Sequence, residues 1–157
     1  MTRHTLGRLH LAAAVAGLML IAAFWTSTII VELFADATAV APLKQAILWG
    51  MLALIPAMAA AGASGFRLGG SSKAPVITAK RRRMMPIAAN GIVVLVPSAF
   101  FLAARAAAGD FDTAFYAVQA VELLAGAINI SLMSLNMRDG LAMTSRRRRR
   151  AAETAAG

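Results

Sequence analysis

Polar residues recur at helical spacing along the last apolar stretch of the chain, residues 113–137. This series, the polar stripe, consists of Gln119, Glu122, Gly126, Asn129, Met133 and Asn136. Alternating steps of three and four residues place these side chains on one face of a helix, at about 100° per residue. A polar face is costly against lipid, so we expect the stripe to contact other helices or water.

Glu122 is the residue of the stripe best suited to chemistry, because it is the only charge in its apolar segment. A carboxylate at that depth must be paired, hydrated or protonated, and it could then serve a proton pathway. Arg105 is its predicted partner, since side chains tilt toward the N-terminus of their own helix and converge from antiparallel neighbours. Glu32, near the end of the first apolar segment, is predicted to share the same guanidinium. Together with Gln119 and Asn129, these residues form a predicted intramembrane polar cluster.

A second polar contact is predicted nearer the basic tail. Asn90 lies near the start of the third apolar segment and Asn136 near the end of the fourth, at matching depth in antiparallel helices. Amide hydrogen bonds between membrane helices average about 0.6 kcal/mol and can set the register of two helices without any other role. Three roles for the stripe therefore stay open: helix packing, a path for a substrate or protons, and a docking face for another subunit.

The residue types needed for common catalytic and metal sites are scarce. The chain has no cysteine, and its two histidines, His4 and His10, both lie at the N-terminal edge. Neither a nucleophile elbow nor a phosphate-binding glycine loop is present. Methionines at helical spacing inside apolar segments are typical of packing. We therefore expect no enzymatic activity, no metal and no cofactor.

Four long apolar segments must position the polar residues. Residues 11–31, 46–66 and 84–104 each form a run of 21 residues without a charge, and 113–137 is the fourth segment. A helix of that length spans about 30 Å, the thickness of a hydrocarbon core. The hydrophobic fraction of 59% also exceeds the roughly 45–50% of soluble domains. The sequence predicts a single all-α domain, a four-helix transmembrane bundle with helices at about 9–33, 44–66, 84–106 and 112–138.

Local signals mark bends and ends within these segments. Pro56 and Pro97 lie in the middle of the second and third segments and are predicted to kink those helices. Arg105 is predicted to end the third helix, with Gly109 available as a helix stop in the short loop that follows, and Asp112 is predicted to cap the fourth helix. The first segment has an alternative interpretation as a cleaved secretory signal, because residues 35–37 read Ala-Asp-Ala.

The charge pattern predicts the orientation in the membrane. Fourteen of the sixteen basic residues lie in the lead before residue 11, the loop 67–83 and the tail 138–157. Cytoplasmic segments carry such an excess of Lys and Arg, so we predict an up-down-up-down bundle with both termini and the basic loop in the cytoplasm. The arginines expected to bind anionic lipid headgroups and anchor the chain are Arg81, Arg82, Arg83, Arg146, Arg147, Arg148, Arg149 and Arg150. No aromatic platform accompanies them, so nucleic-acid binding is not expected.

These patterns predict a multi-pass protein of a bacterial inner membrane, with membrane lipids and either itself or another membrane subunit as partners. The favoured function is that of an accessory or structural membrane protein with an intramembrane polar cluster. The alternative is a small proton-coupled transporter or channel in which Glu122 is the titrating group.

Overall fold

The computed structural model describes residues 2–156, without the side chains of residues 146–148, 150, 151, 155 and 156. The described chain is helical and contains no strand. Its elements are α1 (Arg3–Phe34), α2 (Ala37–Gly69), α3 (Pro75–Asn90), the π-helical turn η1 (Gly91–Leu95), α4 (Val96–Ala108) and α5 (Thr113–Ala156). Four of the described spans are long and apolar enough to cross a membrane: Arg3–Phe34, Ala37–Gly69, Pro75–Ala108 and Thr113–Ser145. The predicted all-α class and the number of membrane helices are confirmed.

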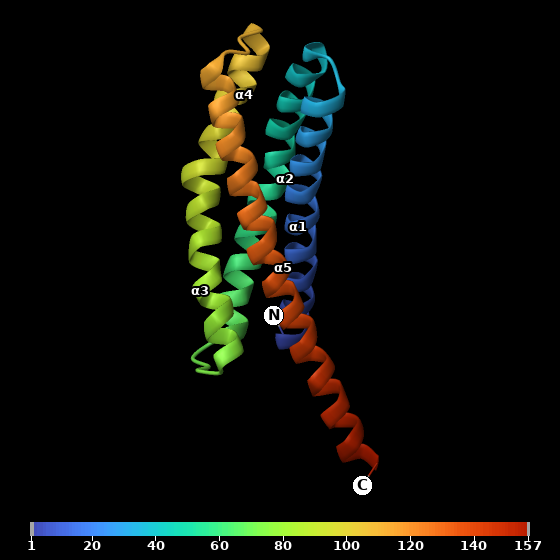
Figure 1. Cartoon of the computed structure of the whole chain (residues 1–157). Helices are drawn as coiled ribbons and strands as arrows, with labels where there is room; N and C mark the ends of the chain where they lie inside the picture. The colour runs from blue at the N-terminus through green and yellow to red at the C-terminus, as the bar shows by residue number, and fades with distance from the viewer. Residues whose placement is uncertain (1, 157) are drawn as a thin grey trace.

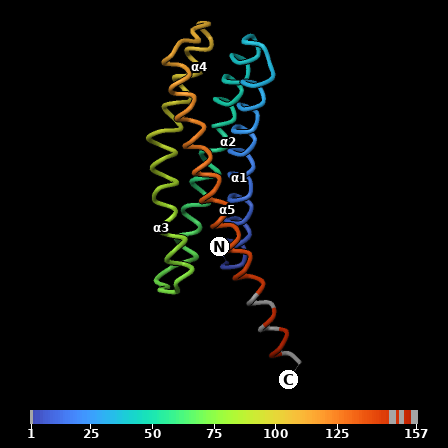
Figure 2. Tube along the Cα trace, viewed as in Figure 1, coloured from blue at the N-terminus to red at the C-terminus, as the bar shows by residue number. Residues whose placement is uncertain are grey.

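The helices lie side by side along the length of the bundle (Figure 1). The α1–α2 and α4–α5 connections lie at one end, here called the aspartate end because it carries Asp36, Asp110 and Asp112. The α2–α3 connection and the start of α1 lie at the other, the basic end. The Cα trace shows α5 continuing past the other helices at the basic end (Figure 2).

Short-range signals explain where several helices start and stop. Thr2 caps α1 by accepting a hydrogen bond from the Thr5 amide at 3.2 Å. Gly109 adopts a left-handed conformation with φ 74° and ends α4, which glycine allows without a steric penalty. The Asp112 carboxylate accepts a hydrogen bond from the Phe115 amide at 3.0 Å and so caps the start of α5. The predicted stop at Gly109 and cap at Asp112 are therefore confirmed.

The predicted helix boundaries are too narrow. The predicted loop 67–83 is wrong: α2 and α3 are joined by residues 70–74 alone, and Arg81, Arg82 and Arg83 lie within α3. Pro75 is favourable in the first turn of a helix, and Lys and Arg are good helix formers, so the basic run extends α3. The predicted tail from residue 138 is likewise helical through Ala156, and Gly157 lies outside the described residues.

Pro56 and Pro97, the two residues predicted to kink their helices, occupy different settings. Pro56 lies inside α2, whereas Pro97 lies in the first turn of α4, two residues after the end of η1. At the end of η1 the Val96 amide donates to the Gly91 carbonyl, the wider spacing of a π turn. Such a turn makes room beside a proline, which lacks an amide hydrogen and crowds the preceding turn. The bend of the axis expected at Pro56 and Pro97 stays a prediction.

The packed interior is small and the outer surface is apolar. One buried cluster near the aspartate end contains Val40, Leu102, Ala106 and Phe115, and a second, toward the basic end, contains Ile21, Ile87 and Met133. Large apolar side chains are exposed along every membrane span, among them Met19, Trp49, Leu52, Ile92, Val93 and Leu124. A protein dissolved in water seldom exposes so much apolar surface, whereas lipid covers it without cost.

Candidate functional site: an ion pair inside the helix bundle

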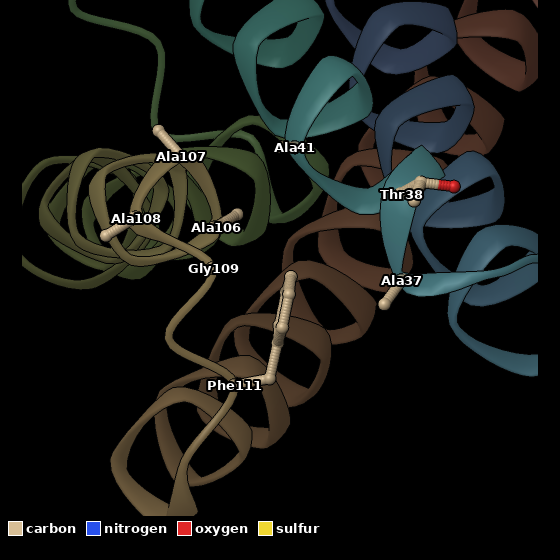
Figure 3. A pocket seen from close by; sticks show the side chains of 8 residues that line it. All are labelled: Ala37, Thr38, Ala41, Ala106, Ala107, Ala108, Gly109 and Phe111. Atoms are coloured by element: carbon tan, nitrogen blue, oxygen red, sulfur yellow. The ribbon is translucent and has the colours of Figure 1, made fainter.

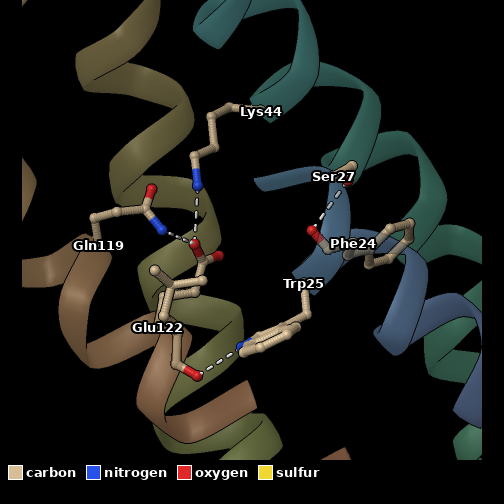
Figure 4. A network of polar contacts seen from close by, with 7 residues as sticks. Phe24, Trp25, Ser27, Lys44, Gln119 and Glu122 are labelled. Atoms are coloured by element: carbon tan, nitrogen blue, oxygen red, sulfur yellow. Dashed lines mark hydrogen bonds and ion pairs between the residues drawn. The ribbon is translucent and has the colours of Figure 1, made fainter. Parts of the chain in front are cut away.

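An ion pair joins α2 and α5 inside the apolar part of the bundle. The Lys44 ammonium of α2 lies 2.9 Å from Oε2 of Glu122 on α5. Gln119, one helical turn before Glu122, donates from its amide nitrogen to the same oxygen at 3.1 Å (Figure 4). The Lys44 side chain is 1% exposed and that of Glu122 is 14% exposed. A carboxylate at this depth in an apolar bundle needs a compensating charge, and the Lys44 ammonium supplies it.

The predicted pairing of Arg105 with Glu122 and Glu32 is wrong. Arg105 lies in the last turn of α4, and its guanidinium pairs with Asp110 at 3.3 Å and with Asp112. The hydrogen bond from Arg105, with that from the Phe115 amide, lowers the pKa of the Asp112 carboxyl. The loop brings two carboxylates to the edge of the apolar region, so the guanidinium avoids the larger desolvation cost of turning inward.

Lys44 takes the place that the prediction assigned to Arg105. Lys44 and Glu122 are the charged groups that interact electrostatically with Glu32. They come from α2 and α5, the two helices against which α1 packs. Oε1 of Glu32 is buried and has no hydrogen-bond partner within the described part of the chain. We call Glu32, Lys44, Gln119 and Glu122 the lysine cluster.

Sequence reasoning missed Lys44 because it placed the residue at the start of the second helix. The helix begins at Ala37, seven residues earlier, so Lys44 lies about 10 Å into it. Glu122 lies nine residues beyond the start of α5 at Thr113, at a comparable depth of about 13 Å from the same end. The apolar run between Asp36 and Lys44 was the signal that the second helix starts earlier. Pro42 within this run suggested instead that the helix begins after it.

The asparagines form different pairs from the one predicted. Asn90 donates to the Asn129 amide oxygen at 2.9 Å and to the Ala125 carbonyl at 2.8 Å. Asn136 instead accepts a hydrogen bond from Arg83 at 3.3 Å. On each helix the two paired residues are seven positions apart, which is two turns. The extended start of α3 places Arg83 opposite Asn136, so the predicted contact between Asn90 and Asn136 is wrong.

The polar stripe faces the inside of the bundle. Gln119, Asn129 and Met133 are buried. A Cβ atom added to Gly126 would lie 2.9 Å from Cδ1 of Trp25, whose indole nitrogen donates to the Leu123 carbonyl at 2.9 Å. The stripe therefore contacts other helices, one of the two surroundings predicted for it.

The basic residues near the start of α3 are partly engaged within the chain. Arg81 donates to the Gly70 carbonyl at the end of α2, and Arg83 pairs with Asp139 at 2.6 Å. Arg82 and Arg149 are exposed. The anchoring role predicted for these arginines stays a prediction. The side chains of Arg146, Arg147, Arg148 and Arg150 lie outside the described residues.

A cavity of about 370 Å³ opens at the aspartate end (Figure 3). It is lined by Ala37, Thr38 and Ala41 of α2, by residues 106–109 and by Phe111. This lining is apolar apart from one hydroxyl and includes no member of the lysine cluster. Within residues 2–156, no group of three His, Cys, Asp or Glu residues is arranged to hold a metal ion.

The four apolar spans and the buried polar contacts between them define a multi-pass membrane helical protein. The chain matches no family model, no curated protein and no solved structure.

Proposed function

We propose that the chain is an accessory or structural protein of a bacterial inner membrane, without covalent chemistry of its own. The observation that supports this function best is the internal pairing of the polar stripe. Glu122 pairs with Lys44, and Asn129 pairs with Asn90. Asn136 pairs with Arg83. Polar groups that pair within the bundle hold its helices in register, the role of interhelical hydrogen bonds in lipid.

The proposed orientation is up-down-up-down, with the basic end and both termini in the cytoplasm. It is supported by the separation of charge, because the aspartate end carries three carboxylates while Lys and Arg gather at the basic end. The proposal retains the first helix in place of a cleaved signal, since Trp25 of α1 donates to α5 across the bundle. The proposed partners are membrane lipids and either a second copy or another membrane subunit, with no role for nucleic acid.

The alternative, a small proton-coupled transporter or channel that uses Glu122, has weaker support. Lys44 and Gln119 both donate to the same oxygen of Glu122. This oxygen of Glu122 is therefore already engaged by two donors within the bundle, one of them a cation. The cavity at the aspartate end also lies apart from Glu122.

Reconstitution into liposomes separates these two functions. An accessory protein should not conduct protons, so a pH gradient should decay at the same rate in liposomes with the wild-type chain and in protein-free liposomes. Glu122→Gln should leave that rate unchanged. A proton flux through the wild-type chain that Glu122→Gln abolishes would establish the transporter and refute the accessory function.

A further inference from the structure

The connected ends of α2 and α3 carry more positive charge than the chain neutralises. Residues 37–109 contain no aspartate and no glutamate, so neither helix supplies a counter-charge of its own. Asp139 of α5 approaches α3 and pairs with Arg83 at 2.6 Å. Arg138 of α5 lies 3.8 Å from the same carboxylate. This carboxylate is therefore already engaged by two cations, and the other cations at this end depend on an anion from elsewhere.

The three consecutive arginines of α3 differ in what their side chains contact. Arg81 donates to the Gly70 carbonyl at the end of α2. Arg83 donates to Asp139 and to Asn136 of α5. Arg82, between them, is exposed and forms no ion pair or hydrogen bond with the described residues. Its guanidinium is therefore available to a partner outside the chain, whereas those of its two neighbours hold helices together.

Two further cations at this end are available in the same way. Arg67 lies in the last turn of α2 and Lys73 in the connection 70–74. Both are exposed, and neither pairs with another residue in the part of the chain that the structure describes. The connection lies at the basic end of the bundle (Figure 1). Arg67, Lys73 and Arg82 thus form a positive surface on the α2–α3 hairpin, here called the hairpin surface.

Exposed apolar side chains border the hairpin surface on the side of the membrane spans. Phe66, which precedes Arg67, is 52% exposed, and Met85, one helical turn after Arg82, is 72% exposed. The uncharged runs 46–66 and 84–104 begin or end at these positions or beside them. Cations therefore lie directly next to apolar groups, the order in which a phospholipid presents its phosphate and its acyl chains.

We propose that the hairpin surface binds the headgroup of an anionic phospholipid. Arg67, Lys73 and Arg82 contact the phosphate, and Phe66 and Met85 contact the acyl chains. Arginine suits this role because its planar guanidinium donates two hydrogen bonds to one phosphate. A zwitterionic lipid is bound less well, because its own cation competes for the phosphate. This inference rests on the proposed function, which names membrane lipids as partners, and adds the class of lipid and the residues that bind it.

Native mass spectrometry of the full chain in detergent micelles tests the hairpin surface. The chain is titrated with dioleoyl phosphatidylglycerol and, separately, with phosphatidylcholine that has the same acyl chains. Arg67→Gln combined with Arg82→Gln should weaken the binding of phosphatidylglycerol by about 25-fold, about fivefold for each cation removed. The binding of phosphatidylcholine should not change. Unchanged binding of phosphatidylglycerol by this double variant would overturn the proposal.

The matched control removes two charges from the same helix end. Arg81→Gln combined with Arg83→Gln should bind phosphatidylglycerol nearly as well as the wild-type chain, because these two side chains are engaged within the bundle. Equal weakening by the two double variants would show that net charge alone attracts the lipid, and would refute the hairpin surface. Circular dichroism verifies that each variant is folded. Lys73→Gln, in the exposed connection, tests the same surface if a double variant does not fold, with an expected weakening of about fivefold.

A soluble phosphate separates a lipid site from a general anion site. Glycerol 3-phosphate carries the phosphate without acyl chains and should not displace phosphatidylglycerol at equal concentration. Displacement would assign the surface to a soluble anion and refute the lipid. Failure of these lipid-binding predictions would leave the accessory function standing, whereas a proton flux through the chain would refute that function without changing lipid binding.

Discussion

The central feature at the residue scale is the Lys44–Glu122 pair, which the apolar surroundings make costly to break. Both side chains are removed from water almost completely. The pair therefore contributes little net stability, because the desolvation of two ions offsets much of their attraction, yet either ion left alone is strongly unfavourable. This asymmetry explains how an ion pair can persist in a bundle of otherwise apolar contacts, and it can be measured.

Lys44→Met alone should lower the free energy of unfolding by about 3–5 kcal/mol, because it leaves the Glu122 carboxylate without its cation. The double variant Lys44→Met with Glu122→Leu should recover most of that loss. Denaturant titration in detergent micelles, followed by circular dichroism, measures both effects. Arg105→Met is the matched control, and its effect should be smaller because Arg105 pairs at the partly exposed end of α4. A double variant no more stable than Lys44→Met would contradict the account.

At the scale of elements, the bundle depends on glycines that let aromatic side chains approach the helix backbone. Phe24 and Trp25, neighbours on α1, pack against different helices. A Cβ atom added at Gly50 of α2 would collide with the Phe24 ring, and one at Gly126 of α5 would lie 2.9 Å from Trp25. Small residues at such positions allow close helix contacts in membranes. Gly126 thus belongs to the polar stripe because a larger residue would collide with Trp25. Its neighbours in the stripe, Glu122 and Asn129, form polar pairs.

Gly126→Ala should destabilise the bundle by about 1–3 kcal/mol, because the added methyl group displaces the Trp25 ring and disturbs its hydrogen bond to Leu123. The same denaturant titration reports the loss of stability, and Trp fluorescence reports the displaced indole. Gly7→Ala near the start of α1 is the control, since nothing lies within 4 Å of the added atom there. Equal effects of the two substitutions would show that helix propensity, and not the contact with Trp25, governs the result.

On the scale of the whole molecule, two features suit a membrane: charged residues lie at the two ends of the bundle, and apolar side chains cover its outer surface between them. The basic end is reinforced by contacts between elements: Arg3 donates to the Leu68 carbonyl at 3.4 Å, and Arg83 pairs with Asp139. The aspartate end is held by the contacts of Arg105 with the α4–α5 connection. These polar contacts link different elements at each end of the bundle.

Because the chain lacks cysteine, single cysteines introduced at exposed sites can report the orientation of the bundle. Ala108→Cys at the aspartate end should react with a membrane-impermeant maleimide in spheroplasts. Ser72→Cys in the α2–α3 connection should react only after the membrane is permeabilised, because the proposed orientation places the basic end in the cytoplasm. Labelling of Ser72→Cys in intact spheroplasts, with Ala108→Cys protected, would reverse the proposed orientation.

Local properties of the sequence were enough to predict the all-helical class, the number of membrane helices and the inward face of the stripe. Apolar length and the 3.6-residue period depend on neighbouring residues only, so they can be read without knowing the fold. The stop at Gly109 and the cap at Asp112 were predictable for the same reason.

Only the tertiary structure decided which polar residues pair. Glu122 pairs with Lys44 and not with Arg105, and Asn90 pairs with Asn129 and not with Asn136. Both pairings depend on the axial register between helices. That register shifts with the residue at which each helix begins, and α2 and α3 begin about two turns before the predicted positions. A shift of two turns moves a side chain by about 11 Å, which is enough to exchange one partner for another while the same face still points inward.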